Sequence, residues 1–156
     1  MDEAKTVVSR LTAQGKTLAT AESCTGGLLG KLITDVPGAS AVYLGGVISY
    51  AYAVKTALLG VDEALLAEKG AVCEAVAAQM AQGVRTLLHA DFALATTGNA
   101  GPSADPKNPN VGEIFIACAS EGNTVCKRLT LSGGREENRM ETCREALRLL
   151  EEVSRD

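Results

Sequence analysis

Residues 21–27 form the segment of the chain best suited to chemistry. They read Ala-Glu-Ser-Cys-Thr-Gly-Gly, follow the short apolar run 17–20 and precede a helical pattern at 28–33. The predicted order of strand, turn and helix places hydroxyl side chains and free backbone N–H groups at the positive end of a helix dipole. Anions and developing oxyanions are stabilised at such a position, and glycine allows a ligand to approach the backbone closely.

Ser23 is a candidate nucleophile, and it needs a base to accept its proton. The only histidine, His89, falls late in a helical pattern and is most simply a helix-end residue, so Lys55 and Tyr50 are the candidate bases. Burial disfavours the charged ammonium form and lowers the pKa of a lysine toward neutrality. The sequence therefore favours a serine–lysine mechanism of acyl transfer, with backbone N–H groups at residues 25–27 stabilising the oxyanion.

Each of these candidates also has a simpler structural explanation. A single Ser or Thr in such a turn is most often an N-cap, whose hydroxyl accepts a hydrogen bond from a helix N–H group. Tyr50 suits the core at a strand end, and an isolated lysine such as Lys55 is usually solvated. Cys24 competes with Ser23 because a helix N-terminus lowers the pKa of a thiol. With no histidine nearby in the sequence to activate it, we interpret Cys24 as a small buried residue beside the working serine.

Two further segments carry turn residues at predicted strand ends, namely residues 49–55 and 97–102. Ligand sites in open α/β sheets gather at the carboxyl ends of strands, so we expect both segments to meet the turn at 23–27 in one pocket. Arg135 and Arg139 lie one helical turn apart and could both bind one phosphate or carboxylate. Isolated arginines, however, more often form surface ion pairs.

Length and composition restrict the class of protein. The 156 residues, 46% of them hydrophobic, suit a single domain, to which we assign residues 1–156. The net charge of -4 and the lack of a Lys/Arg cluster argue against a nucleic-acid partner. No apolar run approaches the ~18 residues that span a bilayer, and the N-terminus is polar, so we expect no membrane partner and a cytoplasmic protein. Five cysteines without a Cys-x-x-Cys pair are most simply reduced thiols, and we expect neither a metal nor a cofactor.

The apolar pattern predicts the elements that must position these residues. Helices are predicted at 3–14, 25–34, 53–59, 63–68, 73–89 and 136–153, and strands at 17–22, 42–50, 92–96, 111–119 and 124–131. Residues 98–112 form a long loop with three prolines, and a loop of that length in a compact domain is usually functional or mobile. The alternation of strands and helices, followed by a hairpin and a helix, indicates a mixed α/β sheet sandwiched by helices.

A series of short motifs extends along nearly the whole chain. They are Ala21-Glu22-Ser23-Cys24-Thr25-Gly26-Gly27, Gly46-Val47-Ile48-Ser49-Tyr50-x4-Lys55, Leu58-Leu59-Gly60-Val61, Gly70-Ala71-Val72, Gly98-x-Ala100-Gly101-Pro102, Val111-Gly112 and Ser132-Gly133-x-Arg135. In this order they resemble the CinA C-terminal domain family, the nicotinamide-nucleotide amidohydrolases. The resemblance implies a single three-layer α/β/α domain with a mixed, mostly parallel sheet, and a homo-oligomer. It also implies hydrolysis of the amide of nicotinamide mononucleotide to nicotinate mononucleotide and ammonia, in NAD recycling.

The resemblance further implies roles for individual residues. The family's nucleophile corresponds to Ser23, and its activating lysine and tyrosine correspond to Lys55 and Tyr50. The implied partner is a small-molecule nucleotide substrate, with no cofactor. The residues expected to bind this substrate are Cys24, Thr25, Gly26, Gly27, Gly46, Thr97, Gly98, Ala100, Gly101, Arg135 and Arg139.

The chain departs from the family pattern beside the retained Ser, Tyr and Lys. Residues 51–54 read Ala-Tyr-Ala-Val where the family has a segment close to Ser-Asn-Glu-Ala, and Asn99 replaces an apolar residue. The loop 103–110 lacks the family's Gly-Gly and its Lys-Pro, and Lys107 lies two positions too early to take over the role of that lysine. These changes keep open a second hypothesis, a non-catalytic module that binds pyridine nucleotides or a protein partner.

Overall fold

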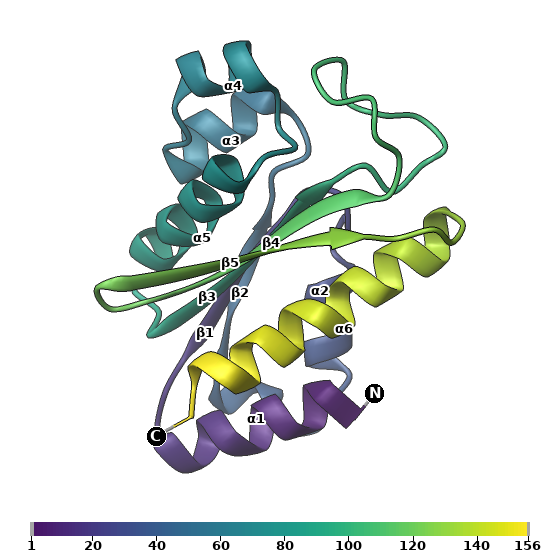
Figure 1. Cartoon of the computed structure of the whole chain (residues 1–156). Helices are drawn as coiled ribbons and strands as arrows, with labels where there is room; N and C mark the ends of the chain where they lie inside the picture. Colours follow the sequence, from purple (N-terminus) through teal and green to yellow (C-terminus); the bar gives the residue numbers. More distant parts are fainter. Residues whose placement is uncertain (1, 156) are drawn as a thin grey trace.

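A five-stranded sheet forms the middle layer of the computed structural model, which describes residues 2–155 (Figure 1). Its strands are β1 Leu18–Glu22, β2 Tyr43–Ile48, β3 Phe92–Gly98, β4 Glu113–Ser120 and β5 Asn123–Thr130, in the order β2-β1-β3-β4-β5. Strand β1 pairs in parallel with β2 and β3, whereas β4 pairs antiparallel with β3 and β5. Four of the five strands therefore run in one direction, which confirms the expected mixed, mostly parallel sheet.

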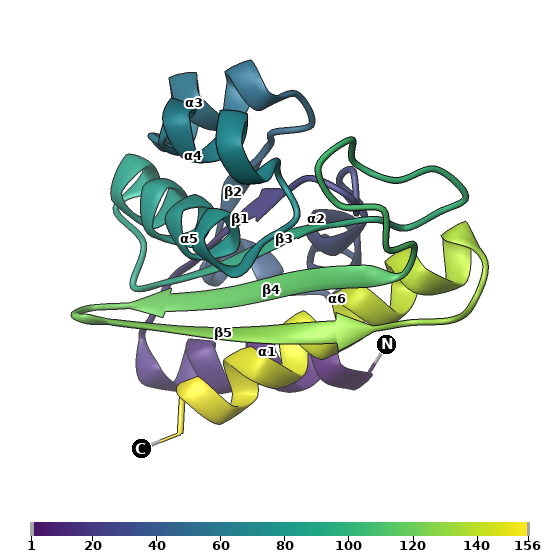
Figure 2. The same cartoon turned by 45° about the horizontal axis from the view of Figure 1, so that its top comes forward.

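Helices cover both faces of this sheet, as Figures 1 and 2 show from two directions. One face carries α1 Asp2–Gln14, α2 Leu28–Thr34 and α6 Arg135–Val153, and the other carries α3 Tyr52–Leu59, α4 Glu63–Lys69 and α5 Glu74–Leu88. A short 3-10 helix, Ala39–Ala41, precedes β2. The three-layer α/β/α arrangement that the family resemblance implied is confirmed. None of the helices in this described range has the length and apolar character needed to cross a membrane.

The two faces of the sheet differ in side-chain size because successive residues of a strand point to opposite sides. Leu94 and Ile116 pack in the core cluster beneath α1 and α6, whereas their strand neighbours Ala95 and Ala117 pack beneath α5. An alanine face occupies little space, so helix α5 can lie close to the sheet. Core packing on both faces thus fixes the strand ends from which the candidate site residues project.

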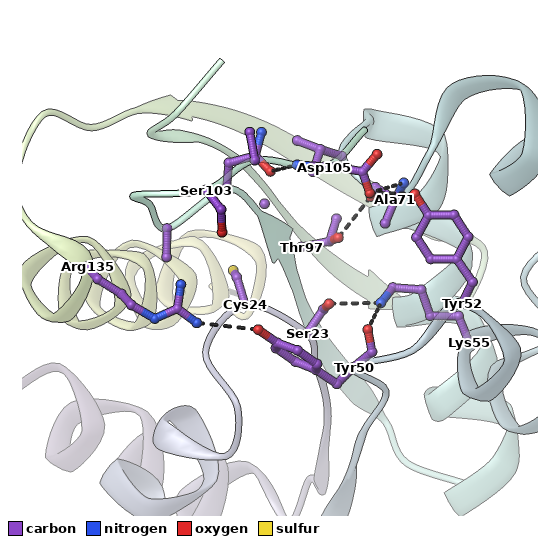
Figure 3. A pocket seen from close by; sticks show the side chains of 15 residues that line it. Ser23, Cys24, Tyr50, Tyr52, Lys55, Ala71, Thr97, Ser103, Asp105 and Arg135 are labelled. Atoms are coloured by element: carbon purple, nitrogen blue, oxygen red, sulfur yellow. Dashed lines mark hydrogen bonds between the residues drawn. The ribbon is translucent and has the colours of Figure 1, made fainter. Parts of the chain in front are cut away.

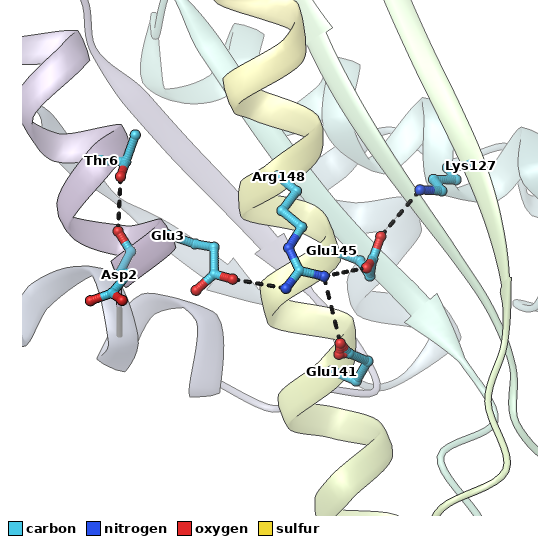
Figure 4. Close-up of polar contacts among 7 residues, drawn as sticks. All are labelled: Asp2, Glu3, Thr6, Lys127, Glu141, Glu145 and Arg148. Atoms are coloured by element: carbon cyan, nitrogen blue, oxygen red, sulfur yellow. Dashed lines mark hydrogen bonds and ion pairs between the residues drawn. The ribbon is translucent and has the colours of Figure 1, made fainter.

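Charged side chains link the outer surfaces of α1, α6 and β5 (Figure 4). Arg148 donates to Glu3 at 3.0 Å and to Glu145 at 2.7 Å, and Lys127 donates to the same Glu145 at 3.1 Å. Both cations are about half exposed, and exposed pairs of this kind contribute little free energy. The apolar clusters therefore hold these helices in place.

The segment after β1 differs from its prediction. A helix was expected from about residue 25, but α2 begins at Leu28. Gly26 and Gly27 have φ angles of +57° and +104°, which an α-helix does not contain. These two glycines make a separate turn that carries Ser23 out of the strand before the helix begins.

Candidate active site

Ser23 and Lys55 meet at the carboxyl end of β1 (Figure 3). The Lys55 Nζ donates to Ser23 Oγ at 2.8 Å and to the Ser49 carbonyl oxygen at 2.5 Å. Lys55 is fully buried, with 0% of its surface exposed, and this burial lowers the pKa of its ammonium group to about 8. A lysine with that pKa is neutral in an appreciable fraction of molecules near pH 8 and can accept the serine proton. The pair therefore has the geometry of a nucleophile and its general base.

A buried carboxylate, that of Glu22, holds the turn in which Ser23 lies. Its Oε1 accepts hydrogen bonds from Thr25 Oγ1 at 2.6 Å, from the Gly27 N–H at 3.2 Å and from the Leu29 N–H at 2.8 Å. Its Oε2 accepts from the Gly30 N–H at 3.0 Å. The Glu22 side chain is only 3% exposed, and its carboxylate occupies the N-terminus of α2, the position at which a free anion would otherwise bind.

The expectation that N–H groups at residues 25–27 bind an oxyanion is wrong for both glycines. The Gly26 N–H donates to the Ser23 carbonyl oxygen at 3.1 Å, and the Gly27 N–H donates to Glu22. The N-cap explanation for Ser23 and Thr25 is also wrong, because Gly27 is the N-cap of α2 and the free N–H groups of the first turn donate to Glu22 instead. Within residues 2–155 no oxygen atom accepts the N–H of Cys24, a residue that lines the pocket.

Cys24 lies beside Ser23 in the pocket wall but has the wrong ionisation for a nucleophile. Its side chain is buried, and this burial raises the pKa of the thiol to about 12. The reactive form of cysteine is the thiolate, and a thiol with that pKa is protonated at neutral pH. The structure thus favours Ser23 over Cys24.

The Tyr50 hydroxyl does not lie where an activating partner of Ser23 would be needed. Tyr50 is 63% exposed, and its hydroxyl oxygen accepts a hydrogen bond from Arg135 at 3.3 Å (Figure 3). Lys55 reaches only the backbone carbonyl oxygen of Tyr50, at 3.4 Å. Within the described residues, no hydrogen bond joins the Tyr50 hydroxyl to Ser23 or Lys55, so it is not placed to relay the serine proton.

A pocket of about 200 Å³ opens beside Ser23 and Lys55. The turn after β1, the start of α3, the end of β3 with the loop that follows it, and the start of α6 all contribute to its wall. This arrangement brings the three predicted segments together, as expected for the carboxyl edge of the sheet. The predicted residues that line it are Ser23, Cys24, Tyr50, Lys55, Thr97, Gly98, Ala100 and Arg135.

The remaining predicted binding residues lie outside this pocket and have structural partners. The Thr25 hydroxyl lies 2.8 Å from that of Thr96, and Arg139 donates to the Thr25 carbonyl oxygen at 2.8 Å. A Cβ atom on Gly46 would come within 2.2 Å of Thr20 Oγ1, so this glycine allows β2 to pair closely with β1. The predicted residues that do not line the pocket are Thr25, Gly26, Gly27, Gly46, Gly101 and Arg139.

Sequence reasoning gave no role to Asn99, whose buried side chain orders the long loop after β3. Its Nδ2 donates to the carbonyl oxygens of Asn108 and Asn110, both at 3.0 Å, and its Oδ1 accepts from the Asp105 N–H at 2.8 Å. Asp105 in turn accepts a hydrogen bond from the Tyr52 hydroxyl, which ties the loop to α3. The only signal for these roles was the polar residue at an apolar position of the Gly-x-Ala-Gly-Pro motif.

Side chains that commonly bind metals are dispersed. Across residues 2–155, no three His, Cys, Asp or Glu side chains are grouped to hold a metal ion. His89 is the C-cap of α5, with a φ angle of +55°, which confirms its interpretation as a helix-end residue.

Comparisons with known proteins agree with this arrangement. A family model described as the CinA C-terminal domain matches residues 2–154. A CinA-like protein of Geotalea uraniireducens is 49% identical over 138 residues, which are 88% of this chain and 33% of that protein. A putative competence-damage inducible protein of Caldanaerobacter subterraneus is 48% identical over 130 residues, 83% of this chain and 32% of that protein. The chain thus spans about a third of the length of these curated relatives.

Solved structures match over nearly the whole chain. The competence/damage inducible protein CihA from Agrobacterium tumefaciens aligns with a TM-score of 0.94 at 36% identity, covering 99% of this chain and 94% of that one. A CinA superfamily protein from Klebsiella pneumoniae aligns with a TM-score of 0.94 at 32% identity, covering 98% and 96%. The agreement of motifs, family model and fold leads to one conclusion: the chain belongs to the CinA C-terminal domain family.

Proposed function

We propose that the chain is an amidohydrolase that converts nicotinamide mononucleotide to nicotinate mononucleotide and ammonia by a serine–lysine mechanism. The observation that carries the proposal is the 2.8 Å contact between Lys55 Nζ and Ser23 Oγ at the wall of a pocket. Burial of a charged lysine is costly, so the fully buried Lys55 is shifted toward its neutral form. The neutral form is the one that can accept the proton of the serine hydroxyl beside it. The family resemblance supports the choice of substrate.

In the proposed reaction, neutral Lys55 accepts the proton of Ser23 as Oγ bonds to the carboxamide carbon. The carbonyl π electrons move to oxygen and give a tetrahedral oxyanion, for which the Cys24 N–H is the available donor. When the C–N bond breaks, the Lys55 ammonium returns its proton to the departing nitrogen and ammonia leaves. Water then loses a proton to Lys55 as its oxygen bonds to the ester carbon. The bond from this carbon to Ser23 Oγ breaks, Lys55 returns the proton to Oγ, and nicotinate mononucleotide leaves.

The size and charge of the pocket support a substrate that is only partly enclosed. Its volume of about 200 Å³ is below the ~300–1,000 Å³ of pockets that enclose a drug-sized ligand. The carboxamide and its ring fill such a space, and the ribose phosphate then extends outward. The exposed guanidinium of Arg135 lines the same pocket and can bind the phosphate through charge-assisted hydrogen bonds.

One observation favours the second function, a non-catalytic pyridine-nucleotide-binding module. The Tyr50 hydroxyl is bonded to Arg135 and not to Ser23 or Lys55, so one member of the family's catalytic set has a different partner here. Such a module would keep the pocket and lose turnover.

Ammonia release by the purified chain given nicotinamide mononucleotide separates the two functions. We expect release by the unmodified chain and by Cys24→Ala, and none by Ser23→Ala. Equal loss in both variants would contradict the assignment of Ser23. No release, together with saturable thermal stabilisation by the nucleotide, would establish the binding module instead.

We also propose that the chain forms a homo-oligomer. Strand β2 is an edge of the sheet and exposes Leu44 and Ile48 by 50% and 56%. Unpaired strand edges and exposed apolar side chains are surfaces at which chains associate. Light scattering during size-exclusion chromatography should give a mass above that of one chain, and a mass of 16.1 kDa would refute the proposal.

A further inference from the structure

A carboxylate lines the pocket on the side away from Arg135. Figure 3 shows Arg135 on one side of Ser23, and Tyr52 and Asp105 on the other. Asp105 supplies the only carboxylate among the described residues that line the pocket. The site thus has a cationic end and an anionic end, with the Ser23–Lys55 pair between them.

Neighbouring groups hold the Asp105 carboxylate without neutralising it. Its Oδ1 accepts from the Lys107 N–H at 2.9 Å, and its Oδ2 accepts from the Ala71 N–H at 3.4 Å and from the Tyr52 hydroxyl. All three donors are neutral groups, since burial and the adjoining Asp105 raise the pKa of the Tyr52 phenol to about 12. Within residues 2–155, no Lys or Arg side chain forms an ion pair with Asp105.

Lys55 does not neutralise the charge of Asp105 when it acts as the general base. Its Nζ is bonded to Ser23 and Ser49, and it must be neutral when it acts as a base. The nearby Asp105 carboxylate raises the pKa of Lys55, against the larger effect of burial. When Lys55 is neutral, however, the carboxylate has no cationic partner in an ion pair among residues 2–155 and lines the pocket. A ligand group that fits beside it is one that carries positive charge, and the rings of Tyr50 and Tyr52 in the same wall also attract cations.

We propose that Asp105 selects a ligand whose ring is cationic, so that the site prefers an oxidised pyridinium nucleotide to its neutral 1,4-dihydro form. The inference rests on the proposed function for the choice of ligand. An amide carbon bound at Ser23 is attached directly to the ring, so the ring lies next to Ser23 and feels the field of the Asp105 carboxylate across the same pocket. The two forms share amide, ribose and phosphate, so they differ mainly in the ring and its charge.

The test is a comparison of binding affinities in a background that cannot consume the ligand. Calorimetry at pH 8 on Ser23→Ala measures the dissociation constants of nicotinamide mononucleotide and of its 1,4-dihydro form. We expect the oxidised form to bind about fivefold more tightly, as for a charge interaction in a partly exposed site. Adding Asp105→Asn should reduce this ratio to about one, and adding the exposed control Glu121→Gln should leave it unchanged.

A second variant separates the charge of Asp105 from its role in ordering the loop. Tyr52→Phe removes the hydroxyl that ties Asp105 to α3 but keeps the carboxylate. We expect Ser23→Ala with Tyr52→Phe to retain the preference for the oxidised form. Equal loss of the preference in the Tyr52 and Asp105 variants would assign the effect to loop order and overturn the inference.

The inference and the proposed function fail in different ways. Suppose that the unmodified chain releases ammonia. If Asp105→Asn then leaves the affinity ratio unchanged, or if Ser23→Ala binds both forms equally, the proposed function is supported and the inference is wrong. If no ammonia is released but the ratio depends on Asp105, the inference stands and the function falls.

Discussion

Replacing Glu22 by Gln should destabilise the fold. Glu22 is the last residue of β1, and its carboxylate accepts hydrogen bonds from the free N–H groups at the N-terminus of α2. The Gln carboxamide oxygen can replace Oε1 as the acceptor for Thr25, Gly27 and Leu29. Its NH₂ group, however, would face the Gly30 N–H, so two donors would meet where Oε2 now accepts at 3.0 Å.

The expected loss follows from these contacts. A hydrogen bond to a charged group contributes about 1.5–3 kcal/mol, and the retained bonds weaken when their acceptor becomes neutral. We therefore expect Glu22→Gln to lower the free energy of unfolding by about 3 kcal/mol, a large part of the ~5–15 kcal/mol of a typical domain.

Urea denaturation followed by circular dichroism measures this free energy by linear extrapolation. The exposed hairpin residue Glu121 gives the matched control, since Glu121→Gln should change it by less than about 0.5 kcal/mol. A Glu22→Gln protein as stable as this control would refute the role given to the buried carboxylate.

Three further predictions concern the catalytic lysine and the long loop. The rate of ammonia release should rise with pH, because only the neutral amine acts as base, and should level off above pH 8, since the pKa of Lys55 is about 8; a rate that falls between pH 7 and 9 would contradict this sign. Lys55→Arg, which keeps a charge that cannot be lost, should reduce turnover by about 10²–10⁴-fold, and turnover near that of the unmodified chain would exclude Lys55 as the base. Asn99→Ala removes three hydrogen bonds within the loop, at ~1 kcal/mol each, and should lower the melting temperature by about 6–12 °C and expose the loop to proteases. An unchanged melting curve and digestion pattern would show that other contacts order this loop.

Most of the fold could be predicted because its elements follow repeating patterns. The short apolar run in β3, whose residues Leu94, Ala95 and Thr96 are all buried, and the helical spacing of Val76, Met80 and Val84 in α5 correspond to surfaces that the structure does bury. The start of α2 could not be placed in this way. It depends on the positive φ angles of two glycines and on the hydrogen bond from the Gly30 N–H to the carboxylate of Glu22, eight residues earlier. Neither feature appears as a repeating pattern in the sequence.

The candidate site, too, contains residues that the sequence predicts and residues that it does not. Ser23 and Lys55 were found because a turn after one parallel strand and a helix after its neighbour must meet at one edge of the sheet. Gly26 and Gly27 were assigned to the ligand because a helix N-terminus usually accepts anions, but Glu22 already fills that position. Asp105 escaped notice because its approach to the pocket depends on side-chain bonds within a loop, which spacing along the sequence does not encode.

The central claim, that Ser23 attacks the amide with Lys55 as its base, is tested most directly by the covalent intermediate. The chain is mixed with nicotinamide mononucleotide, quenched with acid during turnover, digested and examined by mass spectrometry. We predict an ester of the nicotinate mononucleotide acyl group on Ser23, and none in Ser23→Ala. Ammonia release with the acyl group on Cys24, or with no acylated residue at all, would contradict the account.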